Sequence, residues 1–227
     1  MILSQLRSMS RAMIPGAKVQ VIPNADLDLI LSAGAEDIAA YTVCLKANKK
    51  FTITADKYEY KLSTSIGDYI TVDKPGLWWY TGSKWKELWP RTLKWLDINR
   101  PNWRDLGTGN PLYYSIDSDV ITLSPTPNTT LSNGLWLYYG SKSVSMTKNS
   151  DYPFSGSDVE LSHLSIFDYS IIAFARWRIL PMLNKEADAD KLYQEYITER
   201  EMKNIQLKKR LDIANSAEMG LRSPQVR

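Results

Sequence analysis

The hydrophobic residues of this 227-residue chain change their spacing twice, and this change constrains the fold more than any other feature. From Leu27 to Leu45 they recur at steps of three and four residues, the spacing of a helix that packs along one face. From Phe51 to Tyr139 the period is two and turn residues come at short intervals, which predicts antiparallel strands. The helical spacing returns at Ser157. The sequence therefore predicts an α+β fold with a β region inserted between helices.

The first long helix is expected after Pro23, where Asn24 or Asp26 can serve as the N-cap. Gly34 and Ala35 lie on its apolar stripe, where small side chains allow a second helix to approach closely. The 22 residues before this helix combine scattered apolar residues with three basic residues and no acidic one. This pattern favours a short amphipathic helix or a docking arm over an organelle transit peptide.

Two further helices are expected in the last third of the chain. One carries apolar side chains over more than half of its circumference between Leu161 and Ile179, so it should be buried between neighbours. The other begins at Asn184 and approaches roughly 30 residues, beyond the ordinary range of about 8 to 20, so it needs another structure to pack against. The segment from Ser216 to Arg227 has too little apolar content to fold alone and is expected to be a tail.

The β region is expected to contain two hairpins. Their turns are Thr81-Gly82-Ser83 and Asp117-Ser118-Asp119, and the short helix Arg91–Ile98 lies between them. The expected strands are Phe51–Ile53, Tyr58–Leu62, Tyr69–Val72, Leu77–Tyr80, Lys84–Leu88, Tyr113–Ile116, Val120–Leu123 and Leu135–Tyr139.

The expected architecture is a long-helix bundle, formed by the N-terminal helix and the two C-terminal helices, with an inserted antiparallel β domain and an extended C-terminal tail. Its boundaries are an N-terminal arm at 1–22, a helical domain at 23–48 and 158–215, the inserted β domain at 49–157, and the tail at 216–227.

Composition excludes several classes of protein. The net charge of +3 is far from that of a histone-like nucleic-acid binder. The single cysteine, Cys44, excludes intrachain disulfides and is best explained by packing. The longest nearly apolar stretch, Ile171–Ala175, is much shorter than the roughly 20 residues that span a bilayer, so no membrane span is expected.

Catalytic and metal chemistry find little support. The only histidine, His163, has no nucleophile nearby in sequence, and a core or interface position is the favoured interpretation. Asp117 and Asp119 suit a turn better than a two-carboxylate active site. No glycine-rich phosphate loop is present. We therefore expect no enzyme activity, no metal and no cofactor.

Six of the eight tryptophans fall within 26 residues, from Trp78 to Trp103. Trp78 and Trp79 should point to opposite faces of one strand, and Trp85 should come from its hairpin partner. The segment is consistent with a stacking platform for sugars or single-stranded nucleic acid, with a subunit interface, or with the core of a small β domain. The residues proposed for an aromatic interface are Trp78, Trp79, Trp85 and Trp89.

A basic run occupies part of the last helix. Its cationic residues are Arg200, Lys203, Lys208, Lys209 and Arg210, with Glu201 alone opposing them. A solvated helix face is the default interpretation, and a face toward a subunit or a DNA channel is the functional one.

Across residues 23–215 the chain resembles the adaptor, or head-completion, proteins of the tailed-bacteriophage head-to-tail connector. The segments that carry the resemblance are Ala25–Ile30, Pro111–Tyr114, Val120–Pro127, Leu135–Tyr139, Phe154–Leu161 and Ile166–Ala173. Their common pattern is a tyrosine, a β-turn and a strand ending in Ser-Pro-x-Pro, followed by another strand and the helical return. The tryptophan-rich insert at 77–103 departs from that pattern and leaves the outward partner of the β domain open.

The resemblance implies a ring, of about twelve copies, that docks beneath the portal, extends the DNA exit channel and joins capsid to tail. The implied partners are other copies of the chain, the portal protein, downstream tail or neck proteins, and double-stranded DNA that passes without sequence recognition. The implied location is the virion, after assembly in the host cytoplasm. The residues implied to dock on the portal are Leu221, Arg222, Val226 and Arg227. The alternative is an aromatic-rich module that binds glycans or nucleic acid.

Overall fold

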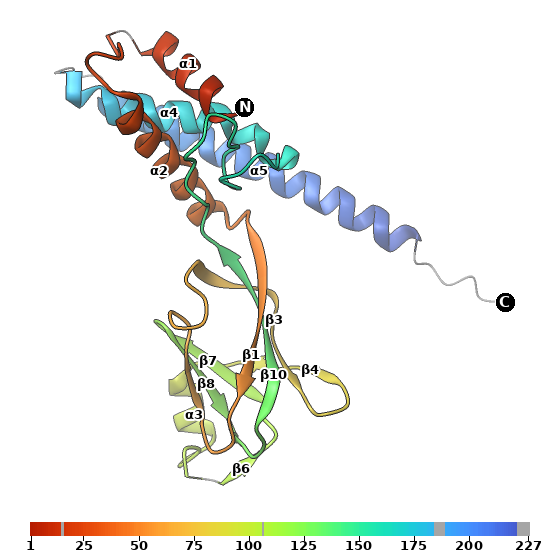
Figure 1. Cartoon of the computed structure of the whole chain (residues 1–227). Helices are drawn as coiled ribbons and strands as arrows, with labels where there is room; N and C mark the ends of the chain where they lie inside the picture. The colour runs from red at the N-terminus through yellow and green to blue at the C-terminus, as the bar shows by residue number, and fades with distance from the viewer. Residues whose placement is uncertain (15, 106, 184–188, 222–227) are drawn as a thin grey trace. The chain divides into compact units, whose positions relative to one another are not determined.

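A computed structural model describes residues 1–14, 16–105, 107–183 and 189–221, and the side chains of these residues apart from 75 and 213–221. The chain divides into two compact units. Unit 1, the helical unit, is formed by Met1–Cys44 and Ser143–Arg227, and unit 2, the β unit, by Leu45–Lys142. The described residues form a mixed α+β structure with five α-helices and several sheets, and Figure 1 shows both units in the ribbon.

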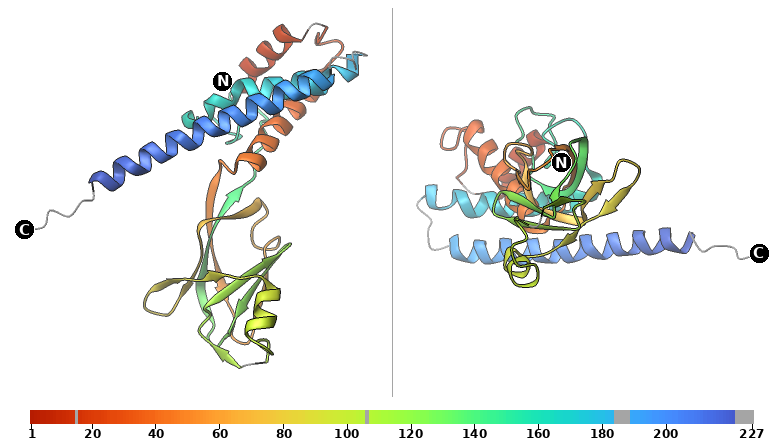
Figure 2. Two further views of the ribbon diagram at one scale, coloured as in Figure 1. Left: turned by 180° about the vertical axis from the view of Figure 1, so that it is seen from behind. Right: turned by 90° about the horizontal axis from the view of Figure 1, so that it is seen from below.

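The α-helices of unit 1 share one central element. They are α1 (Leu3–Met13), α2 (Asn24–Thr42), α4 (Asp168–Ile179) and α5 (Ala189–Leu221), with short 3₁₀ helices η1 (Ser162–Phe167) and η2 (Pro181–Leu183). Helix α4 contacts α1, α2 and α5, and its buried side chains cover more than one face, as expected from the sequence. The views in Figures 1 and 2 agree that α4 lies between α2 and α5.

The close approach of α2 and α4 depends on a glycine. A Cβ atom at Gly34 would lie 3.0 Å from Cδ1 of Phe174, so the ring packs directly on the helix backbone. The prediction of a small-residue stripe at Gly34 and Ala35 is therefore confirmed, because both positions are buried in the contact face of α2. Full burial of a side chain such as that of Phe174 contributes about 1.5 to 3 kcal/mol to the free energy of unfolding.

The first residues of the chain belong to the packed helical unit. Leu3 and Leu6 of α1 are fully buried. The helix begins against the segment before η1, because the backbone N–H of Leu3 donates to the carbonyl of Asp151 at 2.8 Å. This agrees with the expected amphipathic helix.

The start of α4 corrects one expectation. The helical period returns at Ser157 in the sequence, but Tyr152 and Ser157 form a β-bridge, and the chain first becomes helical as η1. The α-helix begins only at Asp168 and ends at Ile179, close to the expected end. The described part of the last helix begins at Ala189. The expected cap of this helix, Asn184, lies outside the described residues. That helix has 33 residues and includes 216–221, so the tail expected from Ser216 is wrong for those residues.

Two four-stranded sheets and a two-stranded ladder form unit 2. The strands are β1 (Lys46–Ile53), β2 (Glu59–Lys61), β3 (Tyr69–Tyr80), β4 (Trp85–Glu87), β5 (Trp89–Pro90), β6 (Thr108–Gly109), β7 (Tyr113–Asp117), β8 (Val120–Ser124), β9 (Thr126–Pro127) and β10 (Leu131–Ser141), with helix α3 (Leu93–Asn99) between β5 and β6. Sheet A has the order β1-β10-β3-β4 and is antiparallel. Sheet B has the order β2-β8-β7-β5, and the short pairs β5/β7 and β6/β9 are parallel.

Both predicted hairpins are present. Tyr80 pairs with Trp85 across the first turn, and Asp117 pairs with Val120 across the second. The two strands expected at Tyr69–Val72 and Leu77–Tyr80 are a single strand, β3. Its register slips around Pro75 and Gly76, because proline cannot donate to the ladder and Gly76 has a φ of +89°.

The core of unit 2 lies on the inner side of the strands. It contains Trp79, Leu77, Leu135 and Leu137 from sheet A and Ile121 and Leu123 from sheet B, all nearly or fully buried. The alternation of β3 places Trp78 on the opposite face of sheet A from Trp79, as the sequence predicts.

Candidate functional site

The tryptophan-rich segment of unit 2 serves both the core and the surface. Trp79 and Trp103 are each 1% exposed, and the indole N–H of Trp103 donates to Asp97 at 2.9 Å. Trp78 and Trp85 are partly exposed, whereas Trp89 is 59% exposed. Trp79 therefore does not lie on the aromatic surface for which it was a candidate.

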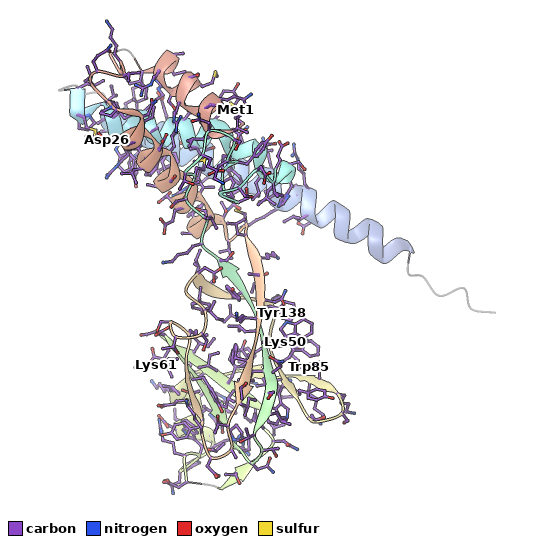
Figure 3. All side chains as sticks on the ribbon, viewed as in Figure 1. Met1, Asp26, Lys50, Lys61, Trp85 and Tyr138 are labelled. Carbon is purple, nitrogen blue, oxygen red and sulfur yellow. The ribbon has the colours of Figure 1, made fainter. Side chains whose placement is uncertain are left out.

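One aromatic surface lies on the outer face of sheet A, and we call it the sheet A cluster. It consists of Tyr80, Trp85, Trp136 and Tyr138 with Lys50, and Figure 3 labels Lys50, Trp85 and Tyr138 together on this face. The Trp85 and Trp136 ring centres are 5.5 Å apart. The Lys50 ammonium lies 4.6 Å from the centre of the Trp136 ring and 5.2 Å from that of Trp85.

This arrangement argues against a sugar platform on the sheet A cluster. Stacking of a sugar or base needs an open ring face. Here the Lys50 ammonium occupies one face of both indoles, and Asn48 accepts a hydrogen bond from the Trp136 indole at 3.0 Å. The Trp136 indole N–H is thus bonded within sheet A, and one face of each indole is covered by Lys50.

A second aromatic surface lies where β5, α3 and β7 meet, and we call it the Arg91 cluster. It consists of Trp89, Arg91, Trp95, Arg100 and Tyr113. The Arg91 guanidinium carbon lies 4.9 Å from the Trp95 ring centre, 5.9 Å from that of Tyr113 and 6.0 Å from that of Trp89. Arg100 approaches the Tyr113 ring centre to 5.3 Å. Each cation is therefore held against aromatic rings by cation–π attraction.

Backbone pairing places the Arg91 cluster. The N–H of Trp89 donates to Leu112 at 2.9 Å and that of Arg91 to Tyr114 at 2.8 Å, so β5 extends the edge of sheet B beside β7. Thr92 then caps α3 by accepting a hydrogen bond from the Trp95 N–H at 3.1 Å. Trp95 lies in the first turn of α3, and its ring centre is 5.4 Å from that of Tyr113.

The basic run of α5 divides into two parts. The Arg200 side chain is 11% exposed and forms an ion pair of 2.7 Å with Asp37 of α2, so it contributes to packing within unit 1. Lys203 is partly exposed, and Lys208, Lys209 and Arg210 are exposed. Only the last three form an open basic face.

A model of the family described as SU10 adaptor protein matches residues 4–222. The chain belongs to this family of phage head-tail adaptors. A search of curated proteins finds no match. Family membership indicates a structural adaptor role at the head–tail junction of a phage particle, in association with portal and tail proteins.

The far end of α5 in this SU10-family adaptor extends beyond the helices that pack against it (Figures 1 and 2). Tyr196 and Leu207 are 1% and 3% exposed against the rest of unit 1. Leu211 continues the same stripe one turn later and is 42% exposed. Of the expected portal-docking residues, Leu221 lies in α5, and Arg222, Val226 and Arg227 lie outside the described residues.

The remaining candidates for chemistry in this adaptor have structural positions. His163 is exposed in η1, so the core position is wrong and the interface position stays a prediction. Burial raises the pKa of the Cys44 thiol, which fits a packing role. Within the described residues, no group of three or more His, Cys, Asp or Glu side chains is placed to hold a metal ion.

The same part of the chain contains no helix that is long and apolar enough to cross a membrane.

Sequence reasoning missed Arg91 and Arg100 as site residues. Each lies within five residues of Trp95 in sequence, and that proximity of cations to aromatics was the available signal. It could not show that Tyr113, thirteen residues beyond Arg100, completes the cluster, because the pairing of β5 with β7 is tertiary.

Proposed function

We propose that this adaptor is the repeating subunit of a ring, of about twelve copies, that docks beneath the portal and extends the DNA exit channel. The observation that carries the proposal is the family match over 4–222. The ring joins capsid to tail, lets DNA pass during packaging and ejection, and assembles in the host cytoplasm before it becomes part of the virion. Its role is mechanical, with no catalytic step and no cofactor.

The geometry of α5 supports contacts between copies. Burial of apolar surface contributes about 25 cal/mol of stabilising free energy for each Å² removed from water. An apolar stripe that continues beyond the helices that cover it therefore favours association with another copy. Leu211 extends the buried stripe of α5, and Met202 and Ile205, on the outward side, are 52% and 54% exposed. A head-to-tail contact in which one copy covers these residues of the next closes into a ring when the rotation permits.

The charge distribution is compatible with a channel. DNA that slides must not be held strongly, and each phosphate contact adds affinity through counterion release. The net charge of the whole chain is only +3. We propose that Lys208, Lys209 and Arg210 face a neighbouring copy or the channel, and that residues 216–227 dock on the portal.

Native mass measurement tests the proposal. The full chain is measured alone, with a purified portal ring, and as a variant that lacks residues 216–227. We expect the full chain to join the portal ring in a fixed number of copies. The shortened chain should lose portal binding while it loses only the helical circular dichroism of residues 216–221. Full-affinity binding by the shortened chain would show that the docking assignment is wrong.

A control variant tests whether the loss of portal binding is specific to residues 216–227. Asp158 is exposed in the loop before η1, and Asp158→Asn should join the portal ring as the full chain does. A chain that stays monomeric with and without the portal ring would contradict the ring itself.

A further inference from the structure

The arginines of the Arg91 cluster differ from the third arginine of unit 2 in their partners. Arg104 forms an ion pair with Asp97 at 3.0 Å. Within the part of the chain that the structure describes, Arg91 and Arg100 have no carboxylate within ion-pair distance. Two cations are therefore held in place by aromatic rings, and no carboxylate among the described residues neutralises their charge.

Arg91 also has a hydrogen-bonding atom without a partner. Its Nη1 donates to the carbonyl of Pro90 at 2.9 Å, but its Nε is enclosed and makes no hydrogen bond within the described residues. A buried donor without an acceptor costs about 1 to 3 kcal/mol. Because Nε is enclosed, an acceptor from a partner would meet Arg91 at its other guanidinium N–H groups and not at Nε.

Exposed apolar side chains lie on or next to the elements that carry the Arg91 cluster, on β5, on α3 and just before β7. Trp89, Ile98 and Leu112 are 59%, 65% and 51% exposed. Tryptophan, tyrosine and arginine are the residues most enriched among the anchors of protein interfaces. The cluster thus has anchors that are already positioned by β5, α3 and β7, and further exposed apolar side chains lie on or next to the same elements.

We propose that the Arg91 cluster is the docking site for an acidic, partly apolar segment of a different protein. Carboxylates of that segment pair with Arg91 and Arg100, and its apolar side chains pack against Trp89 and Leu112. The site belongs to unit 2 and α5 to unit 1, so this adaptor would bind a second partner through residues other than those proposed for the ring and portal.

Charge favours a different protein over another copy of the β unit. Unit 2 has thirteen Lys and Arg residues against nine Asp and Glu residues, so two β units repel. The exposed apolar side chains of Trp89, Ile98 and Leu112 disfavour a DNA backbone, which binds through many phosphate contacts. The guanidinium groups over the rings disfavour a stacked sugar.

Site-specific photo-crosslinking tests the proposal in assembled particles. A photoreactive phenylalanine analogue replaces Leu112, whose backbone pairs with that of Trp89, or Ser83 at the exposed tip of the β3–β4 turn as a control, in the full chain supplied during phage assembly. We expect Leu112 to cross-link to one other virion protein, at a peptide that contains Asp or Glu, and Ser83 to give no such product.

Substitutions then test whether charge holds the contact. Arg91→Gln and Arg100→Gln, made separately, should each lower the yield of the Leu112 product by about tenfold, the loss expected for an interface anchor. Arg91→Glu should be rescued by changing the cross-linked acidic residue to Arg. Circular dichroism and the thermal midpoint verify that each variant folds, and Arg100→Gln provides an independent test if Arg91→Gln does not.

Each contrary outcome overturns the proposal. These outcomes are a product with DNA, a product with another copy of this chain, no product from incorporated chain, or a yield that neither substitution changes. This inference rests on the proposed function in one respect, that the chain is incorporated into phage particles. Failure of the chain to enter particles would contradict the proposed function, whereas normal entry without the cross-link would contradict this inference alone.

Discussion

The guanidinium carbon of Arg200 lies 3.7 Å from the ring centre of Tyr41 and joins the last helix of the chain to α2. Its Nη1 also donates to Asp37 at 2.7 Å, and the Tyr196 hydroxyl donates to the same carboxylate. A residue that looks like part of a basic face is thus the centre of a packed network in unit 1. The stability of the α2–α5 contact should depend on it.

Replacement of Arg200 by methionine should lower the free energy of unfolding by about 1 to 3 kcal/mol. The change removes a charge-assisted hydrogen bond and a cation–π contact while keeping the apolar part of the side chain. Urea unfolding followed by circular dichroism measures the effect. The control Lys208→Met, at an exposed position of the same helix, should change stability by less than about 0.5 kcal/mol. Equal effects of the two substitutions would show that the network contributes nothing.

Enlarging Gly34 should separate α2 from α4. Gly34→Leu places a side chain where the Phe174 ring already lies, and overpacking of this kind typically costs about 1 to 3 kcal/mol. The same change at Ala40, an exposed position of α2, should be nearly neutral. Thermal unfolding of both variants gives the comparison. A second substitution, Phe174→Ala, should partly rescue Gly34→Leu because it vacates the contested volume.

The predictable parts of the fold are those that local chemistry determines. The hairpin of β7 and β8 follows from its turn, in which Ser118 adopts a φ of +53° between strands of alternating pattern. The pairing of β1 with β10 joins residues such as Lys50 and Trp136, which are far apart in sequence. No periodicity encodes such a pairing, so the central position of β10 in sheet A could not be predicted.

The site residues show the same division. Alternation predicts that Trp78 and Trp79 face opposite ways, but it does not say which face meets the core. Sheet B covers the face of Trp79, and this decides that Trp79 is buried. Likewise, Arg200 is buried against α2 whereas the cations at 208–210 are exposed. The local sequence around Arg200 contains no signal of this tertiary contact.

Tyr139 should make the β unit sensitive to alkaline pH. Burial and the hydrogen bond to Asp68 raise the pKa of Tyr139 to about 12. In the unfolded chain the pKa of a tyrosine is about 10. Between these two pKa values the unfolded state binds fewer protons than the folded state, so the free energy of unfolding falls as pH rises. Urea midpoints between pH 9 and 12 should fall less steeply for Tyr139→Phe than for the unmodified chain. Parallel slopes would contradict this.

Asp151 should make the helical unit sensitive to acid. Its carboxylate accepts hydrogen bonds from the backbone N–H groups of Lys148 and Thr147, each at 2.7 Å, and these lower the pKa of Asp151. The stabilisation is therefore present above the pKa of aspartate in the unfolded chain, about 3.9, and is lost as pH falls through the lower pKa of Asp151 in the folded chain.

Asp151→Asn should accordingly be less stable than the unmodified chain at pH 7, with a difference that shrinks toward pH 3. Urea midpoints at both pH values measure this. Asp158→Asn, in the exposed loop nearby, supplies the control and should leave the difference near zero. A difference that is independent of pH would show that the carboxylate charge is not what holds the turn.

Leu207 and Leu211 should respond in opposite ways to the same substitution. Leu207 is buried in unit 1, so Leu207→Asp leaves an unpaired charge in an apolar site and should unfold or strongly destabilise the chain. Leu211 lies one turn later and is 42% exposed, so Leu211→Asp should leave the urea midpoint nearly unchanged. If the continued stripe is the surface covered by a neighbouring copy, Leu211→Asp should weaken assembly by about tenfold or more in native mass or sedimentation measurements. Unchanged assembly would place the contact between copies on another face, because a charge at the centre of an apolar interface cannot be neutral.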